Sequence, residues 1–331
     1  MRIVFLGSPE VVVSALKKLQ QDCPGHQLVG VVSQPAKPFG RGGQVRNPAV
    51  AEYAMSVGLP LLQPESAKDP DFQNQLKELE PDVCVTAAYG QILNDAFLGI
   101  PKRATINIHP SLLPQYRGAS PVQSALYEGD TVTGVTILFT VRALDAGAII
   151  CQKEFTIDPE ETAVNLMPRL FQEGANLLPE ALEKLSNPEF SGTPQDASAV
   201  THCRKFSKED GKVDWTRSAV FVRNCYRAFQ PWPGIFTFLG DKRIALTAVE
   251  TTDGDTNLSP GQFEFHKPTK VLLCGTGAGA LAIRKLKPAG SKEQDAAAFW
   301  NGVQGKVSQY QFGSLNNESS PHCRGCFWWR P

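Results

Sequence analysis

A short apolar run from Ala104 to Ile108 has the composition of a buried strand, and it contains Asn107 and is followed directly by His109. Residues two apart on a strand point to the same face, so these two side chains are predicted to lie together. A proline-bounded loop follows, and an open α/β sheet carries its chemistry where strands end in loops. An amide donor beside an imidazole can stabilise an oxyanion and move a proton.

A third polar residue, Asp145, lies in the sequence Leu144-Asp145-Ala146-Gly147. Taken alone, this pattern suits a turn, and the aspartate would need no further explanation. Beside Asn107 and His109, however, the carboxylate could orient the imidazole, or accept the proton of an amine directly or through a water. The three residue types together fit acyl transfer to an amine. A Ser-His-Asp hydrolase is disfavoured, since the sequence lacks a Gly-x-Ser-x-Gly elbow.

Three sequence motifs resemble the formyltransferase family that uses 10-formyltetrahydrofolate, most closely its members that act on methionyl-tRNA. The motifs are Asn107-Ile108-His109-Pro110-Ser111-Leu112-Leu113-Pro114, Tyr116-Arg117-Gly118 and Leu144-Asp145-Ala146-Gly147. The resemblance extends from Arg2 to about Gly302. It implies that Asn107, His109 and Asp145 are catalytic, that 10-formyltetrahydrofolate is the co-substrate, and that no metal takes part. Folate contacts are expected from backbone groups and apolar walls at Ser111, Leu112, Leu113, Pro114, Ala88, Tyr89 and Gly90.

A glycine-rich segment between Ser33 and Pro48 is longer than an ordinary connection between a strand and a helix. In the resembling family a comparable basic loop enters the acceptor stem of the tRNA. The resemblance therefore implies that Arg41, Lys37 and Arg46 contact the initiator methionyl-tRNA. Gly43-Gln44 stand where relatives typically carry lysines, which predicts weaker and less salt-sensitive binding.

Strands and helices alternate along the first half of the chain, which predicts an α/β fold with a mostly parallel sheet. Short β-type runs with turns between them follow in the second half, as in a small barrel. The resemblance implies a Rossmann-like formyltransferase domain followed by an OB-like β-barrel domain that binds tRNA. The expected divisions are a catalytic domain at 1–186, a linker at 187–203, the barrel at 204–306 and an unassigned tail at 307–331.

The 331 residues carry 33 basic and 33 acidic side chains, so net charge alone does not indicate a nucleic-acid binder. No apolar run is long enough to span a membrane, and the N-terminus lacks the order of a secretory signal. We expect a monomer without a membrane partner. It would be cytoplasmic if bacterial, or inside a mitochondrion or plastid if it is an organellar enzyme whose targeting peptide is missing. His322, Cys323 and Cys326 resemble half of a zinc site, but no second ligand pair completes it.

Two other functions are compatible with parts of the sequence. A relative could formylate a small amine, such as a ribonucleotide or an amino-sugar nucleotide. The long loop around Arg41 and the later Pro231-Trp232-Pro233-Gly234 argue against the ribonucleotide, and less firmly against the amino sugar. A folate- or RNA-binding protein without catalysis is disfavoured by the intact Asn107, His109 and Asp145.

Overall fold

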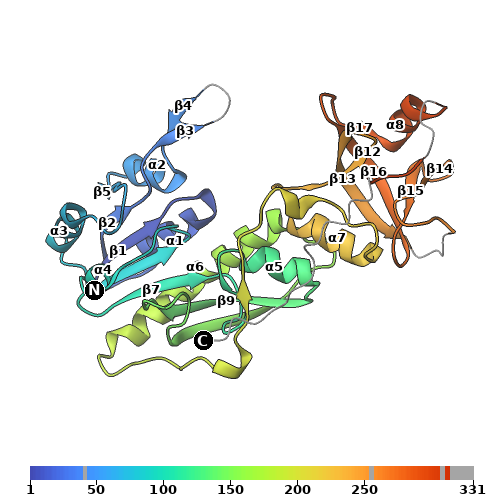
Figure 1. The fold of residues 1–331 in the computed structure, drawn as a ribbon. Coiled ribbons are helices and arrows are strands. Elements are labelled where there is room, and N and C mark those ends of the chain that lie inside the picture. Colours follow the sequence, from blue (N-terminus) through green and yellow to red (C-terminus); the bar gives the residue numbers. More distant parts are fainter. Residues whose placement is uncertain (40–42, 253–256, 306–309, 314–331) are drawn as a thin grey trace. The chain divides into compact units, whose positions relative to one another are not determined.

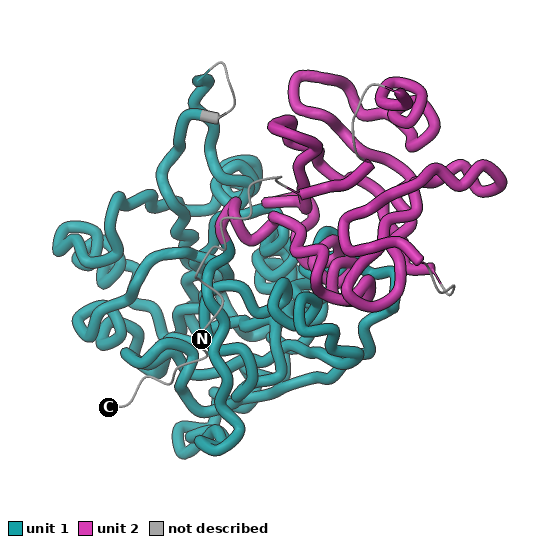
Figure 2. Tube along the Cα trace, turned by 45° about the vertical axis from the view of Figure 1, so that its right-hand side comes forward, with its two compact units in different colours: residues 1–206 teal, residues 207–331 magenta. Residues whose placement is uncertain are grey.

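The computed structural model describes residues 1–39, 43–252, 257–305 and 310–313. The chain divides into two compact units, residues 1–206 and residues 207–331 (Figure 2). The first unit contains an α/β sheet and the second an antiparallel sheet, which confirms the predicted fold class.

The first unit is built on a seven-stranded sheet (Figure 1). Its strands are β1 (Arg2–Gly7), β2 (Gln27–Val32), β5 (Leu61–Leu62), β6 (Val83–Ala87), β7 (Ala104–His109), β9 (Val132–Phe139) and β10 (Ile149–Thr156). Their order is β10-β9-β7-β6-β1-β2-β5. The five strands from β7 to β5 run parallel, whereas β9 is antiparallel to β7 and β10 is antiparallel to β9. The connection that carries Asp145 therefore joins two paired strands, β9 and β10.

Helices and short strands complete this unit. They are η1 (Glu10–Val12), α1 (Val13–Gln21), β3 (Lys37–Phe39), β4 (Gln44–Arg46), α2 (Ala49–Ser56), α3 (Pro70–Glu78), α4 (Asp95–Leu98), β8 (Arg117–Gly118), α5 (Pro121–Glu128), α6 (Ala163–Ser186), η2 (Ala197–Ala199) and β11 (His202–Cys203). The segment 33–48, expected as an irregular loop, contains a hairpin in which Lys37 pairs with Arg46. Strands of three residues beside glycines leave too short a pattern to read from sequence.

The sheet is apolar on both faces because successive side chains of a strand point to opposite sides. In β1, Ile3 and Phe5 join a core with α1 and α6, while Val4 and Leu6 join a second core with α3 and α4. All four of these side chains are fully buried. The central strands are therefore held from both sides, which makes their carboxyl ends a rigid platform.

Helix α6 packs directly on the strand that carries Asn107 and His109. A Cβ atom at Gly174 would lie 2.4 Å from Ile108 Cγ2 and 3.0 Å from Val135 Cγ2, so only glycine allows this approach. Ile108 lies between the two polar residues and points to the opposite face of β7, into the core. The close packing of α6 thus fixes the part of β7 that presents them.

The second unit is an antiparallel sheet of order β12-β13-β16-β15-β14, with β17 paired to β16. Its elements are η3 (Glu209–Gly211), α7 (Ala219–Ala228), β12 (Ile235–Leu239), β13 (Lys242–Thr252), β14 (Phe263–His266), β15 (Val271–Gly275), β16 (Ala280–Pro288), β17 (Gln294–Asp295) and α8 (Ala296–Val303). Phe312, from the part of the chain left unassigned by sequence, is buried and stacks on Phe263 at a centroid distance of 4.2 Å.

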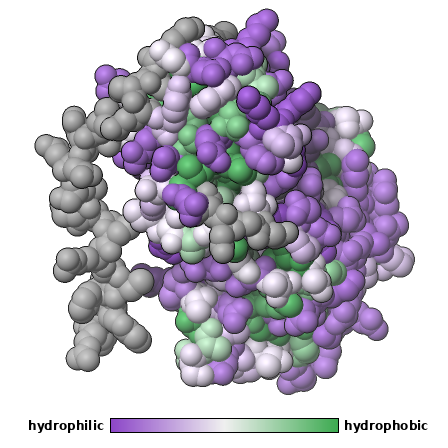
Figure 3. All heavy atoms as spheres, turned by 90° about the vertical axis from the view of Figure 1, so that its right-hand side faces the viewer, coloured by the Kyte–Doolittle hydropathy of each residue, from purple (hydrophilic) through white to green (hydrophobic). Residues whose placement is uncertain are grey.

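Hydrophilic residues dominate the described surface on the face shown in Figure 3, and apolar residues appear there in separate patches. Among the described residues, no helix is both long and apolar enough to cross a bilayer.

Replacing Gly174 by alanine tests the packing of α6 on β7. We expect Gly174→Ala to lower the free energy of unfolding by roughly 1–3 kcal/mol, since the added methyl group forces Ile108 and Val135 apart. Gly302→Ala in α8 is the matched control: a Cβ there meets nothing within 4 Å, so helix propensity should stabilise it by about 0.5–1 kcal/mol. Urea unfolding followed by circular dichroism measures both. Equal stability changes in the two variants would contradict the packing argument.

Candidate active site

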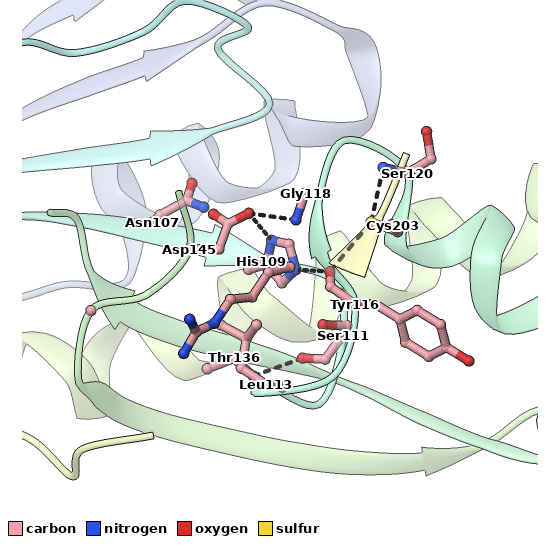
Figure 4. A network of polar contacts seen from close by, with 12 residues as sticks. Asn107, His109, Ser111, Leu113, Tyr116, Gly118, Ser120, Thr136, Asp145 and Cys203 are labelled. Carbon is pink, nitrogen blue, oxygen red and sulfur yellow. Dashed lines mark hydrogen bonds and ion pairs between the residues drawn. The ribbon is translucent and has the colours of Figure 1, made fainter. Parts of the chain in front are cut away.

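Strand β7 presents Asn107 and His109 on the same face, as the spacing predicted (Figure 4). Asn107 is paired in register with Thr86 of β6, and Thr86 Oγ1 donates a hydrogen bond of 2.8 Å to Asn107 Oδ1. This contact orients the amide so that its oxygen is engaged and its NH₂ group is presented as a donor.

His109 is 3% exposed, and both of its ring nitrogens face identified groups. Nε2 lies 3.0 Å from the carbonyl oxygen of Tyr116. A carbonyl can only accept, so Nε2 carries a hydrogen in this contact. The other nitrogen, Nδ1, lies 3.7 Å from Asp145 Oδ2. The neutral imidazole therefore has its lone pair at Nδ1, on the side of the carboxylate.

Asp145 reaches His109 from the connection between β9 and β10, and its carboxylate is largely buried. Its Oδ2 also accepts a hydrogen bond of 2.9 Å from the backbone N–H of Gly118. The backbone of Asp145 is in the left-handed region, with φ of 50°, a conformation that a non-glycine residue adopts only when its surroundings impose it. Gly147 packs so closely that a Cβ would lie 1.8 Å from the carbonyl oxygen of Phe139.

Two opposing effects set the pKa of His109. Burial lowers the pKa below its ordinary value, because the charged imidazolium loses hydration. The Asp145 carboxylate and the hydrogen bond to the Tyr116 carbonyl raise it, but burial is the largest effect and the net direction is downward. Burial thus favours the neutral imidazole, in which Nδ1 carries a lone pair.

Residues that the sequence assigned to a linker surround this cluster. Thr201 Oγ1 accepts a hydrogen bond of 2.8 Å from the backbone N–H of Tyr116. Cys203 Sγ donates at 3.4 Å to the same Tyr116 carbonyl that His109 uses. Gln195 contacts the backbone at Asp145 and Gly147. Nothing in their local sequence could have indicated this, because the contacts span about fifty to ninety residues of chain.

The loop Ser111–Pro114 is held by hydrogen bonds within the unit. Ser111 Oγ donates to the carbonyl of Gln115 at 2.7 Å, so the hydroxyl is engaged locally. The backbone of Leu113 binds Thr136 Oγ1 through its N–H and Gln152 Nε2 through its carbonyl, at 3.2 and 2.9 Å. Leu113 is buried, whereas Leu112 and Pro114 are partly exposed.

The segment Ala88–Gly90 follows β6 beside this cluster. Ala88 and Gly90 are exposed and have positive φ values of 43° and 80°, so the extended conformation of β6 does not continue through them. The ring of Tyr89, in contrast, packs in the core with α3 and α4, and its burial raises the pKa of the phenol. Its carbonyl accepts a hydrogen bond of 2.9 Å from Gln34 Nε2.

The hairpin β3–β4 carries the predicted basic residues Lys37 and Arg46, both exposed. Lys37 Nζ donates at 2.8 Å to Gln34 Oε1, so the base of the hairpin is connected through Gln34 to the Ala88–Gly90 segment. Arg41 lies outside the described residues.

Within the described ranges, no group of three or more His, Cys, Asp or Glu side chains could hold a metal ion. His322, Cys323 and Cys326 lie outside the part of the chain that is described.

Comparison with known proteins identifies the class to which this fold and site belong. The formyl transferase family model matches residues 1–182, and the model of the formyl transferase C-terminal domain matches residues 205–304. A methionyl-tRNA formyltransferase of Chloroflexus aurantiacus is 42% identical over 305 residues, which cover 92% of this chain and 97% of that protein. The chain therefore belongs to the formyl transferase family, among the methionyl-tRNA formyltransferases.

Solved structures of lower identity share the fold. HypX from Aquifex aeolicus, in complex with tetrahydrofolic acid, matches with a TM-score of 0.58 and 19% identity, covering 92% of this chain and 48% of that chain. An N-formyltransferase from Helicobacter canadensis, in complex with folinic acid and dTDP-3-aminofucose, matches with a TM-score of 0.62 and 15% identity, covering 85% and 98%.

Removing the charge of Asp145 tests the electrostatics of the site. We expect Asp145→Asn to lower the pKa of His109 further, because burial then acts without the opposing carboxylate. NMR titration of the imidazole resonances measures the change. Asp95→Asn, an exposed carboxylate paired with Arg142, serves as the control and should leave the pKa of His109 unchanged. A pKa of His109 that stays constant or rises in Asp145→Asn would contradict the assignment.

Proposed function

We propose that this protein transfers the formyl group of 10-formyltetrahydrofolate to the α-amino group of initiator methionyl-tRNA, for translation initiation. The observation that carries the proposal is the convergence of Asn107, His109 and Asp145 from two distant segments into one largely buried cluster. The identity to methionyl-tRNA formyltransferases over nearly the whole chain supports the choice of acceptor.

The first requirement of the reaction is stabilisation of negative charge. When the amine attacks the formyl carbon, the carbon–nitrogen bond forms and an oxyanion develops on the formyl oxygen. Asn107 is placed to donate its amide N–H to that oxygen, with Thr86 holding the other side of the amide. A preorganised donor in a water-poor site stabilises such charge more than water does.

The second requirement is removal of a proton from the attacking nitrogen. His109 is buried and neutral, and its Nδ1 lone pair lies beside Asp145. The imidazole takes the proton at Nδ1, and the carboxylate stabilises the imidazolium that forms. The proton is then delivered to N10 of the folate as the carbon–N10 bond breaks. The Tyr116 carbonyl keeps the Nε2 hydrogen in place throughout.

Folate is proposed to bind along two backbone segments near this cluster. Ala88 and Gly90 offer exposed backbone, and Tyr89 contributes through its backbone since its ring is in the core. Ser111, Leu112, Leu113 and Pro114 form the other wall, where the hydroxyl of Ser111 fixes the loop. The tetrahydrofolate bound by HypX, which has a similar fold, supports a folate site in this architecture.

The tRNA is proposed to meet Lys37, Arg41 and Arg46 in the segment of the β3–β4 hairpin, and the barrel-like second unit. In this proposal residues 1–186 form the catalytic domain, 204–306 bind the tRNA, 187–203 connect them and 307–331 have no assigned role. The protein is proposed to act as a monomer without a membrane partner. Its compartment is the bacterial cytoplasm, or the interior of a mitochondrion or plastid.

A formyl-transfer assay tests the acceptor. With 10-formyltetrahydrofolate as donor, we expect product with charged initiator methionyl-tRNA and none with free methionine or an amino-sugar nucleotide. His109→Ala should lower kcat roughly 10²- to 10⁴-fold, because a general acid–base is lost. Circular dichroism of the variant controls for folding. Formylation of the sugar nucleotide alone would leave the chemistry in place and reject the acceptor.

The salt dependence of tRNA binding tests the basic hairpin. Each of Lys37→Ala, Arg41→Ala and Arg46→Ala should reduce the slope of log K against log salt by about 1, since one phosphate contact is lost. Filter binding at several salt concentrations measures the slope. Lys102→Ala, which removes an exposed lysine near Glu80, is the matched control and should leave the slope unchanged. Slopes that remain at the parental value in all three hairpin variants would rule out these contacts.

A further inference from the structure

We propose that Gln195 is a positioning residue for the reaction proposed above, on which this inference rests. Its side-chain amide holds the backbone of Asp145 and Gly147, so that the Asp145 carboxylate is kept facing His109. Gln195 touches neither ring nitrogen of His109 nor the carboxylate itself; it acts through the chain that carries the carboxylate.

Four hydrogen bonds use the full capacity of the Gln195 amide. Nε2 donates to the carbonyl oxygens of Asp145 and Gly147 at 2.8 and 2.7 Å. Oε1 accepts from Nε and Nη2 of Arg117 at 3.0 and 2.7 Å. A glutamine amide has two N–H donors and two acceptor lone pairs, and each has a partner here.

The hydrogen-bond partners of this side chain also explain why glutamine suits the position. Carbonyl oxygens only accept and a guanidinium only donates, so the orientation of the amide is unambiguous. A carboxylate at this position would keep Arg117 but would face two carbonyl oxygens with no hydrogen to share. An apolar side chain of the same size would leave the two carbonyl oxygens and part of the guanidinium without these hydrogen bonds.

Together with Arg117 and Gly118, Gln195 closes a ring of contacts around Asp145. Gly118 N–H holds the carboxylate oxygen, and Arg117, its neighbour in β8, holds Gln195. Gln195 then holds the carbonyl of Asp145 itself. The carboxylate and the backbone of one residue are thus fixed from the same two-residue strand, by two separate routes.

The Asp145 loop needs such a hold. Asp145 has a left-handed backbone, and Leu144, its neighbour, is 68% exposed, so apolar packing does not secure that side of the loop. The segment that carries Gln195 is itself anchored: Thr193 and Ile149 exchange two backbone hydrogen bonds of 2.8 Å, and Thr201 N–H donates to the carbonyl of Pro114. Gln195 therefore links Asp145 to a segment that is itself held by backbone hydrogen bonds to β10 and to the Pro114 loop.

Two variants test the proposal. Gln195→Met keeps the size of the side chain but removes its polar atoms, and Gln195→Glu keeps the size and the contact with Arg117. We expect both to lower kcat roughly 10- to 100-fold, the effect of a misplacement of about 1 Å, while KM for both substrates stays within about twofold. Gln172→Met, an exposed glutamine on α6, is the matched control and should retain parental kcat and KM.

The pKa of His109 provides a second readout, and its NMR titration needs no substrate. With Asp145 displaced, the pKa of His109 should fall further in Gln195→Met, which adds no charge, since the carboxylate that raises this pKa has moved away. NMR titration of His109 and the acid limb of the kcat profile should shift together to lower pH. In an Asp145→Asn background, Gln195→Met should cost little more, because the group on which it acts is gone.

Parental kcat in either variant, or an unshifted His109 titration in Gln195→Met, would overturn the positioning role. A rise in KM alone, or a full additional loss in the Asp145→Asn background, would also overturn it. If the parental protein fails to formylate methionyl-tRNA, the proposed function is rejected, and the His109 titration still decides whether Gln195 holds Asp145.

Discussion

The Asp145 carboxylate and the His109 imidazole face each other across 3.7 Å in a part of the protein that is largely closed to water. Burial disfavours the charged form of His109, and the nearby carboxylate partly opposes this effect. The compensation requires the carboxylate to stay in place, although it lies on an irregular loop with a left-handed backbone. The hydrogen bonds from Gly118 to the carboxylate and from Gln195 to the backbone of Asp145 both help to hold the carboxylate in this place.

The site takes residues both from a strand of the sheet and from a loop. Strand β7 supplies the two residues that need a rigid support, and α6 secures that strand through contact at Gly174. The connection between β9 and β10 supplies the residue that must approach from outside the strand. Precise placement of a proton acceptor and an oxyanion donor is what acyl transfer demands, and it is easier on a strand than on a loop.

Most of the fold prediction rests on the periodicity of apolar residues along the chain. The buried strands and their order of alternation with helices were readable because each has a strong apolar pattern, and the α/β class with a second antiparallel domain is confirmed. The hairpin β3–β4 was missed because its strands are three residues long. The ring of Tyr89 packs into the core, so only its backbone is left for the proposed folate contact; the sequence does not show which way a ring turns at the end of a strand.

The sequence alone determined that Asn107 and His109 share a face, because a strand has a period of two, and it indicated Asp145 as the third member of the proposed catalytic set. It also determined that a basic, glycine-rich segment precedes Pro48. Only the tertiary structure decided how Asp145 is held. Gln195 meets Asp145 across fifty positions of chain, and no local pattern encodes such a contact. Hydrogen bonds between distant segments depend on where the sheet brings the chain, so they emerge only when the whole unit has folded.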